Sequence, residues 1–272
     1  MFGKVGRISI IAPHGPCADR LLNDVLDLIS RFEDTVRRDQ TGSELLHLCG
    51  ADVGRYVPVS HWFWHLLQLA NDISYRTDGL FDVAAAGTGG IARWADIDLS
   101  QLGAVRLRRK MFLSLGGIVK GFAVDLAVKA LQETGVAAGL VDIGGCIRSF
   151  GSSEWRIEFI PPQQRFKQSD REQEATADRA GVPVPLQNSS LAGCGSYFGG
   201  ARLMDIEKGV TMSALEWGDT NLLVRAQSCA VADALSKVAA IRPESSKKIL
   251  AQFGAEATVL TAFGVERLKY AS

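Results

Sequence analysis

Residues 113–125 read Leu-Ser-Leu-Gly-Gly-Ile-Val-Lys-Gly-Phe-Ala-Val-Asp, the clearest signal in this 272-residue chain. Alternating apolar residues end at Gly116-Gly117, and a helical pattern over 118–134 begins directly after them. Such a turn lets backbone N–H groups approach an anion, and the helix N-terminus adds partial positive charge. Lys120 adds a full charge in the first turn. The stretch therefore predicts a strand, a glycine turn and a helix where a phosphate can bind.

A plainer interpretation of this stretch stays open. A tight strand-to-helix turn followed by a solvated lysine explains the same residues, because the GxxxxGK[ST] pattern of a phosphate-binding P-loop is absent. A second glycine pair, Gly144-Gly145, follows a predicted strand over 140–143 and is equally typical of a hairpin turn. Two such turns in one chain raise the expectation that both meet at one polyanion.

Composition excludes several classes of protein. Thirty Lys and Arg balance thirty Asp and Glu, and a formal net charge of zero argues against a dedicated nucleic-acid binder. Five cysteines form no CxxC pair, so neither a disulfide framework nor a cysteine zinc site is expected. No apolar run has the length of a signal peptide core or a membrane helix. We therefore expect a cytoplasmic protein without a membrane span.

Hydrophobic periodicity predicts an α+β fold. We expect helices over 17–38, 61–76, 118–134, 228–241 and 244–253. We expect strands over 6–12, 56–59, 105–107, 111–115, 140–143, 155–160, 221–226, 256–261 and 264–269. The polar stretch at about 163–186 is typical of an exposed loop within a single domain, 1–272.

Two further groups of side chains are candidate ligands. His61 and His65 stand four residues apart on a predicted helix, which is the spacing of a metal-binding pair, but the tryptophans beside them favour aromatic packing. Asp233 lies among small apolar residues, where a lone carboxylate needs a partner: a cation, a helix cap or a metal.

Taken in order, these motifs resemble the ApbE family, the FAD:protein FMN transferases, from about residue 20 to 240. Ser43-Glu44-Leu45 resembles the family's Ser-Glu segment, and 77–82 resembles its Thr-x-Gly-x-Phe-Asp motif. Residues 116–121 are close to its Gly-Gly-Ile-Ala-Lys-Gly signature. Gly144-Gly145 matches its second glycine motif, and 232–235 matches its Ala-Asp-Ala-Leu segment.

The resemblance implies a fold, a substrate and a reaction. The fold is the ApbE-like, T-fold-related α+β architecture with mixed sheets, packed helices and a nucleotide cleft between two halves. The reaction is Mg²⁺-dependent transfer of FMN from FAD to a Thr or Ser hydroxyl of a flavin-accepting target protein, with release of AMP. The implied FAD-binding residues are Glu44, Phe81, Asp82, Gly116, Gly117, Lys120, Gly144 and Gly145.

The chain departs from the family pattern at the chemistry. The implied metal positions are Gly117, Asp233 and Lys237, and Lys237 stands where the family has Thr. A protonated lysine cannot ligate Mg²⁺, but its ammonium group can take the place of the cation. The implied catalytic positions are Arg202 and Asp205, and Arg202 stands where the family has its histidine base. An arginine cannot act as a base near neutral pH.

Three hypotheses follow. The chain is an active flavin transferase with altered metal ligation. Alternatively, it is a catalytically impaired homologue that binds FAD or another nucleotide without transfer, or it is a scaffold that binds no nucleotide.

Overall fold

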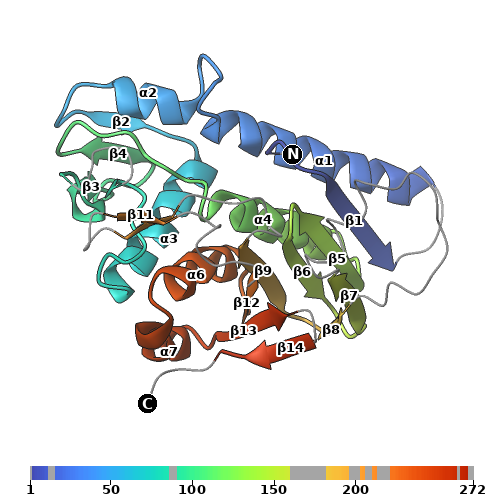
Figure 1. The fold of residues 1–272 in the computed structure, drawn as a ribbon. Helices are drawn as coiled ribbons and strands as arrows, with labels where there is room; N and C mark the ends of the chain where they lie inside the picture. Colours follow the sequence, from blue (N-terminus) through green and yellow to red (C-terminus); the bar gives the residue numbers. More distant parts are fainter. Residues whose placement is uncertain are drawn as a thin grey trace, which may run out of the picture.

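The computed structural model describes residues 2–11, 16–85, 91–159, 182–195, 203–205, 210–212, 221–261 and 264–268 (Figure 1). They form two groups of elements: a larger lobe around a seven-stranded sheet and a smaller lobe around a three-stranded sheet. No helix in these ranges is long and apolar enough to cross a membrane.

The sheet of the larger lobe is antiparallel at every pairing. Its strand order is β1 (Gly6–Ile11), β5 (Ala138–Ile143), β6 (Cys146–Phe150), β9 (Ser190–Gly195), β12 (Asn221–Ala226), β13 (Glu256–Thr261) and β14 (Gly264–Arg267). β5 and β6 form a hairpin across Gly144-Gly145, so this glycine pair lies at one end of two central strands.

Helices cover one face of this sheet. α4 (Val119–Glu133) and α6 (Cys229–Ile241) pack against it and each other, while α1 (Pro16–Val36) lies on the outside of α4 (Figure 1). α7 (Pro243–Gln252) follows α6. Because side chains alternate along a strand, Val141 and Ile143 join the main core under the helices. Leu140 joins a second core, covered by the hairpin of β7 (Trp155–Phe159) and β8 (Val182–Leu186).

The smaller lobe combines a three-stranded antiparallel sheet with two helices. The sheet order is β2 (Tyr56–Pro58), β4 (Ala104–Leu107) and β3 (Ile97–Asp98), with the short 3₁₀ helix Trp94–Asp96 (η2) before β3. The helices are α2 (Glu44–Gly50) and α3 (His61–Arg76), whose N-termini are capped by the hydroxyls of Ser43 and Ser60. A separate pair, β10 (Leu203–Asp205) and β11 (Val210–Met212), completes the described elements.

Asp98 links strands β3 and β4 of the smaller lobe. Its carboxylate, whose side chain is 3% exposed, accepts hydrogen bonds from the guanidinium groups of Arg106 and Arg108 and from the N–H of Ser100. The Arg106 hydrogen bonds, together with those from Ser100, hold the pKa of Asp98 well below its usual range.

We expect Asp98→Asn to lower the free energy of unfolding by about 2 kcal/mol at pH 7. The change removes the negative charge with which two partly exposed arginines, Arg106 and Arg108, form ion pairs. A folded-state pKa below the unfolded value of about 3.9 means that this stabilisation is complete above about pH 5 and declines as the pH falls. Urea unfolding of both proteins from pH 7 to pH 3 measures the difference. A difference in the free energy of unfolding between the two proteins that stays constant from pH 7 to pH 3 would contradict the lowered pKa of Asp98.

The predicted α+β class is confirmed, and most elements agree within two residues. α3, β12 and β13 have the predicted bounds. The strand predicted over 111–115 is wrong: this segment alternates between buried and partly exposed residues, but Ser114 N–H bonds singly to Val83 O and no ladder forms. The loop predicted over 163–186 is wrong at its end, because Val182–Leu186 form β8 with Val184 and Leu186 buried. The single-domain organisation stays a prediction.

Candidate functional site

The turn at Gly116-Gly117 joins the buried segment 111–115 to α4. Ile118 and Val119 both donate backbone hydrogen bonds to Leu115 O, at 3.0 Å each, which begins the helix directly after the turn. A Cβ atom at Gly117 would lie 3.3 Å from Cε2 of Phe81 and 3.9 Å from Cγ of Lys237, whereas one at Gly116 would meet nothing within 4 Å. Gly117 thus lets the ring of Phe81 and the stem of Lys237 approach the backbone of the turn.

Asp233, on α6, is the centre of a buried charge cluster behind this turn. Its side chain is fully buried and is hydrogen-bonded by the ammonium group of Lys237, four residues further along α6. Its second oxygen lies 3.6 Å from Nζ of Lys120 and accepts the N–H of Gly121 at 3.3 Å. The cluster therefore joins the first turn of α4 to the middle of α6.

Both members of the central ion pair are charged at neutral pH. Burial by itself raises the pKa of Asp233, but the charges of Lys237 and Lys120 outweigh it and the pKa lies below its ordinary value. Burial by itself lowers the pKa of Lys237, but the charge of Asp233, its hydrogen bond and the other neighbouring groups together more than offset this, so that pKa lies above its ordinary value. Two ammonium groups face one carboxylate, so the cluster keeps a net positive charge that suits an anion.

The second glycine pair forms the β5–β6 hairpin turn. Gly144 and Gly145 both have positive φ, +58° and +86°, as a tight hairpin turn requires. The N–H of Gly145 donates to Oδ1 of Asp142 at 3.0 Å. A Cβ atom at Gly144 would lie 3.7 Å from Cδ of Lys120, so this turn lies against the same lysine as the first one. The hairpin interpretation is therefore confirmed and both turns lie beside Lys120, while their meeting at one polyanion stays a prediction.

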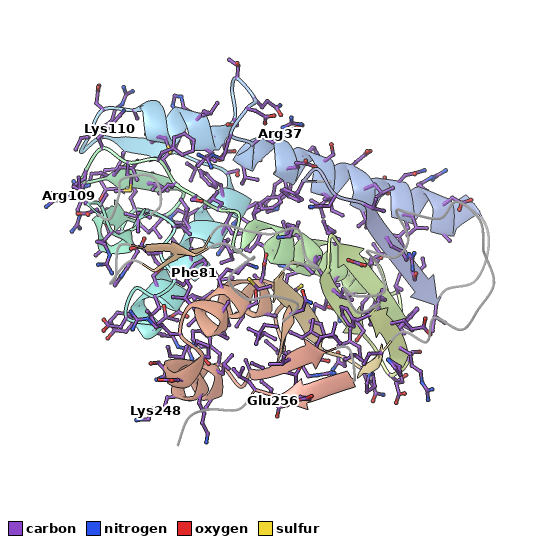
Figure 2. The ribbon with its side chains drawn as sticks, in the orientation of Figure 1. Arg37, Phe81, Arg109, Lys110, Lys248 and Glu256 are labelled. Carbon is purple, nitrogen blue, oxygen red and sulfur yellow. The ribbon has the colours of Figure 1, made fainter. Side chains whose placement is uncertain are left out.

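Two predicted residues make other contacts within the smaller lobe. Glu44 accepts the N–H of Ser60 at 2.7 Å, which ties α2 to the start of α3. Asp82 is fully buried and accepts the N–H groups of residues 84 and 94 together with Nε of Arg93 at 3.0 Å. These contacts hold the chain around the site, and the predicted roles of Glu44 and Asp82 in FAD binding stay predictions. Phe81, which precedes Asp82 in the chain, lies near the centre of the molecule, beside α6 (Figure 2).

The predicted catalytic positions are placed only in part. Arg202 lies outside the described residues. Asp205 ends β10, whose backbone packs against α6, the helix that carries Asp233 and Lys237.

The donor set around Asp233 does not fit a divalent cation. Mg²⁺ binds to oxygen ligands in an octahedral arrangement. Here the carboxylate already accepts hydrogen bonds or ion-pair contacts from Lys237, Lys120 and Gly121. No group of three His, Cys, Asp or Glu that could hold a metal occurs among the described residues. His61 and His65 pack against each other instead, with ring centroids 4.1 Å apart.

Sequence reasoning missed a partly buried acid that positions the site. Asp125, on α4, pairs with Arg148 of β6 and accepts hydrogen bonds from Ser228 Oγ and from the N–H groups of Cys229 and Ala230. It therefore caps α6 from the neighbouring helix. The available signal was an acid on the otherwise apolar face of α4, but its partner in α6 stands 103 residues away.

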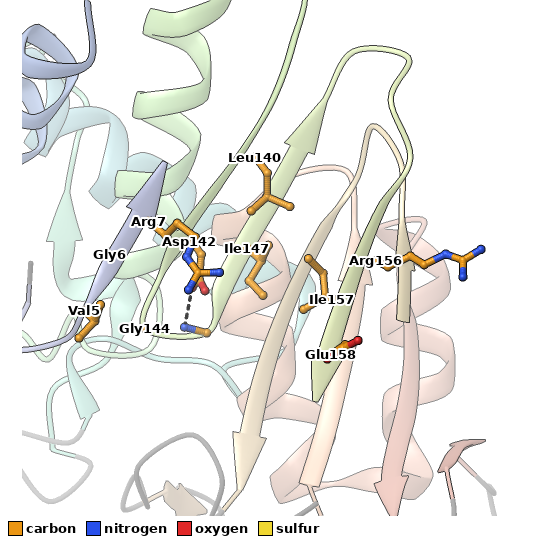
Figure 3. A pocket seen from close by; sticks show the side chains of 11 residues that line it. Val5, Gly6, Arg7, Leu140, Asp142, Gly144, Ile147, Arg156, Ile157 and Glu158 are labelled. Atoms are coloured by element: carbon orange, nitrogen blue, oxygen red, sulfur yellow. Dashed lines mark hydrogen bonds between the residues drawn. The ribbon is translucent and has the colours of Figure 1, made fainter. Parts of the chain in front are cut away.

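A separate hollow of about 400 Å³ lies on the other face of the sheet (Figure 3). Its walls come from β1, β5, β6 and β7, and the Gly144-Gly145 turn closes one end. Asp142 lies in it, and burial raises the pKa of this carboxyl. The sequence did not predict this hollow, and it is distinct from the cluster around Asp233, which lies under α4 and α6.

Comparisons with known proteins place the fold. The structure resembles the flavinyl transferase ApbE of Pseudomonas stutzeri (TM-score 0.75, 17% identity, covering 94% of this chain and 87% of that one). It also resembles the flavin transferase ApbE of Vibrio cholerae (TM-score 0.75, 18% identity, covering 99% and 94%). A third match is the ApbE protein of Thermotoga maritima (TM-score 0.74, 18% identity, covering 98% and 94%).

Sequence comparison gives the family. No curated protein sequence matches the chain. The sequence profile of the ApbE family matches residues 90–260, well over half of the chain, and this range contains both glycine turns and the Asp233 cluster. The chain therefore belongs to the ApbE family.

Proposed function

We propose that this chain binds FAD and transfers its FMN moiety to a Thr or Ser hydroxyl of a target protein, releasing AMP. The observation that carries the proposal is the pair of ammonium groups, Lys120 and Lys237, held beside the Gly116-Gly117 turn. A diphosphate needs positive charge and backbone that it can approach closely. Family membership and the names of the similar structures point to a flavin nucleotide as its carrier.

The residues of the site have separable roles in this reaction. Lys120 and Lys237 neutralise the diphosphate, and Gly117 lets the stem of Lys237 approach the turn. Phe81, 7% exposed, supplies an apolar surface next to the phosphates. The acceptor oxygen attacks the phosphorus on the FMN side, the bond to the AMP phosphate breaks, and AMP leaves with the electron pair. The hydroxyl proton goes to solvent or to a base on the acceptor protein. In such transfers positioning and charge neutralisation supply most of the catalysis.

A second function is favoured by Arg202 at the position of the family's base. A chain that binds FAD without transferring it has no need of a base there, and a guanidinium group does not accept protons near neutral pH. One assay separates the two functions. FAD and a purified flavin-accepting protein are incubated with the chain, and AMP is measured by chromatography while flavin fluorescence is read on the denatured acceptor. AMP with a fluorescent acceptor supports transfer; FAD binding without AMP supports the second function.

We expect Lys120→Met to weaken FAD binding about tenfold or more, because a hydrogen bond to a charged group contributes about 1.5–3 kcal/mol. Quenching of flavin fluorescence on titration measures the affinity. Lys129→Met is the matched control: the same change on the same helix, at a side chain that is 71% exposed. Equal affinities for Lys120→Met and the parent chain would remove Lys120 from the site.

A further inference from the structure

The cluster around Asp233 differs from a metal site because a lysine side chain, Lys237, pairs with the carboxylate. Lys237 stands four residues after Asp233, so both side chains lie on one face of α6. Its ammonium group bonds to Oδ1 of Asp233 and lies 3.0 Å from Oγ of Ser236. The ammonium group of Lys237 is thus bonded to the carboxylate that a metal ion would need as a ligand.

We propose that the ammonium group of Lys237 replaces the divalent cation of the nucleotide site, so that this chain binds the diphosphate of its nucleotide without a metal ion. This proposal rests on the proposed function for the identity of the nucleotide. The positive charge that would bind a diphosphate comes from Lys120, Lys237 and Asp233, whichever nucleotide binds.

Position supports this substitution. The stem of Lys237 passes the Gly116-Gly117 turn, with Cγ 3.9 Å from where a Cβ of Gly117 would be. The side chain is 13% exposed, so it is held in the wall of the site rather than extended into solvent. The stem of Lys237 is therefore held next to the glycine turn at which the proposed function places the diphosphate.

Charge supports it as well. Two ammonium groups and one carboxylate leave one net positive charge, which is available to a diphosphate. A Mg²⁺ ion would have to separate Lys237 from Asp233 and then remain beside two like charges, where Coulomb repulsion at a few ångströms is large in a buried site. The hydroxyl of Ser236 donates to Asp233 O at 2.7 Å, and its oxygen accepts from the Lys237 ammonium group at 3.0 Å, so Lys237 also occupies this hydroxyl oxygen.

The first experiment uses the unaltered chain. FAD affinity is measured by flavin fluorescence in millimolar Mg²⁺ and in EDTA, and pyrophosphate affinity is measured by calorimetry in EDTA. We expect the two FAD affinities to agree within about twofold, since no ion enters the site, and we expect pyrophosphate to bind in EDTA. FAD binding that falls tenfold or more in EDTA would overturn the proposal.

The outcomes separate this proposal from the function on which it rests. Pyrophosphate binding in EDTA without any FAD binding ends the flavin function and leaves the role of Lys237 standing. FAD binding that occurs only with Mg²⁺ supports the flavin function and overturns the role of Lys237. Binding of neither ligand under either condition contradicts both.

Two variants then test the residue itself, each first checked for folding by circular dichroism. Lys237→Thr restores a carboxylate and a hydroxyl one helical turn apart, and Lys237→Met keeps the apolar stem without charge or ligand. We expect both to bind FAD at least tenfold more weakly in EDTA, and Mg²⁺ to restore binding in Lys237→Thr alone. Unchanged affinity in Lys237→Met, or no response of Lys237→Thr to Mg²⁺, would overturn the proposal. Lys129→Met, on the exposed face of α4, should behave as the parent chain.

Discussion

Replacing Gly121 by alanine is expected to destabilise the protein by about 3 kcal/mol, although glycine to alanine within a helix ordinarily stabilises by about 1 kcal/mol. A Cβ atom on Gly121 would lie 2.3 Å from the carbonyl oxygen of Cys229 and 2.7 Å from Cα of Ala230. Both are backbone atoms, which cannot rotate away as a flexible side chain can. The two helices would have to separate, and the predicted sign is opposite to that given by helix propensity.

Gly116→Ala is the matched control for this change. It lies in the same motif, has no positive φ, and a Cβ atom there would meet nothing within 4 Å. Urea unfolding followed by circular dichroism compares the variants with the parent chain. We expect Gly116→Ala to change the free energy of unfolding by no more than about 0.5 kcal/mol. A Gly121→Ala variant as stable as the parent would mean that α4 and α6 are not in backbone contact.

The close crossing of α4 and α6 explains why a glycine follows Lys120 in the motif. The N–H of Gly121 donates to Asp233 at the point where the helices touch, and Lys120 reaches the same carboxylate from the preceding position. A wider crossing would break both contacts. The residue that permits the helix packing therefore also holds the charge cluster together.

Helices whose ends are set by residues next to them in the sequence, such as α3 and α4, were predicted correctly. Ser60 is a typical N-cap residue and lies directly before α3, and Gly135, with φ +83°, follows the end of α4, and both helices were predicted within a residue of their bounds. Elements decided by distant partners were missed or misplaced. The alternation at 111–115 is that of a strand, but among the described residues no strand pairs with it, and the N–H groups of Leu113 and Ser114 bond singly to Cys49 Sγ and Val83 O. β8 contains Pro183 and Pro185, which argue against a strand, yet β7 pairs with it along one edge.

The candidate site divides in the same way. The two glycine turns, Lys120 and Asp233 could be selected from the sequence because each belongs to a short motif. That Lys237 pairs with Asp233 follows from helical spacing and could be anticipated. The hydrogen bonds of Asp82 could not be anticipated, because its partners at residues 93 and 94 become neighbours only when the smaller lobe folds. Motif membership alone does not distinguish a residue that touches a ligand from one that holds the motif in place.

Asp125→Ala is expected to lower the free energy of unfolding by about 3–5 kcal/mol, because it breaks a mostly buried ion pair and removes the acceptor of the first two N–H groups of α6. Arg148 is 21% exposed and would lose its partner, while the N–H groups of Cys229 and Ala230 would lose their acceptor. Asp125→Asn keeps an oxygen acceptor of the same size without the charge, so we expect a smaller loss. We expect the free energy of unfolding to increase from Asp125→Ala to Asp125→Asn to the parent chain. The first difference measures the hydrogen-bond acceptor and the second measures the charge.

Glu133→Ala supplies the control for Asp125, because Glu133 also forms an ion pair on α4, with Lys129, but both side chains are more than half exposed. We expect that change to cost no more than about 0.5 kcal/mol, as is usual for exposed pairs of this spacing. Urea unfolding at pH 7 measures all four proteins. If Asp125→Ala and Glu133→Ala proved equally mild, α6 would be held without Asp125, and the N-terminus of α6 would need another anchor to keep Asp233 beside Lys120.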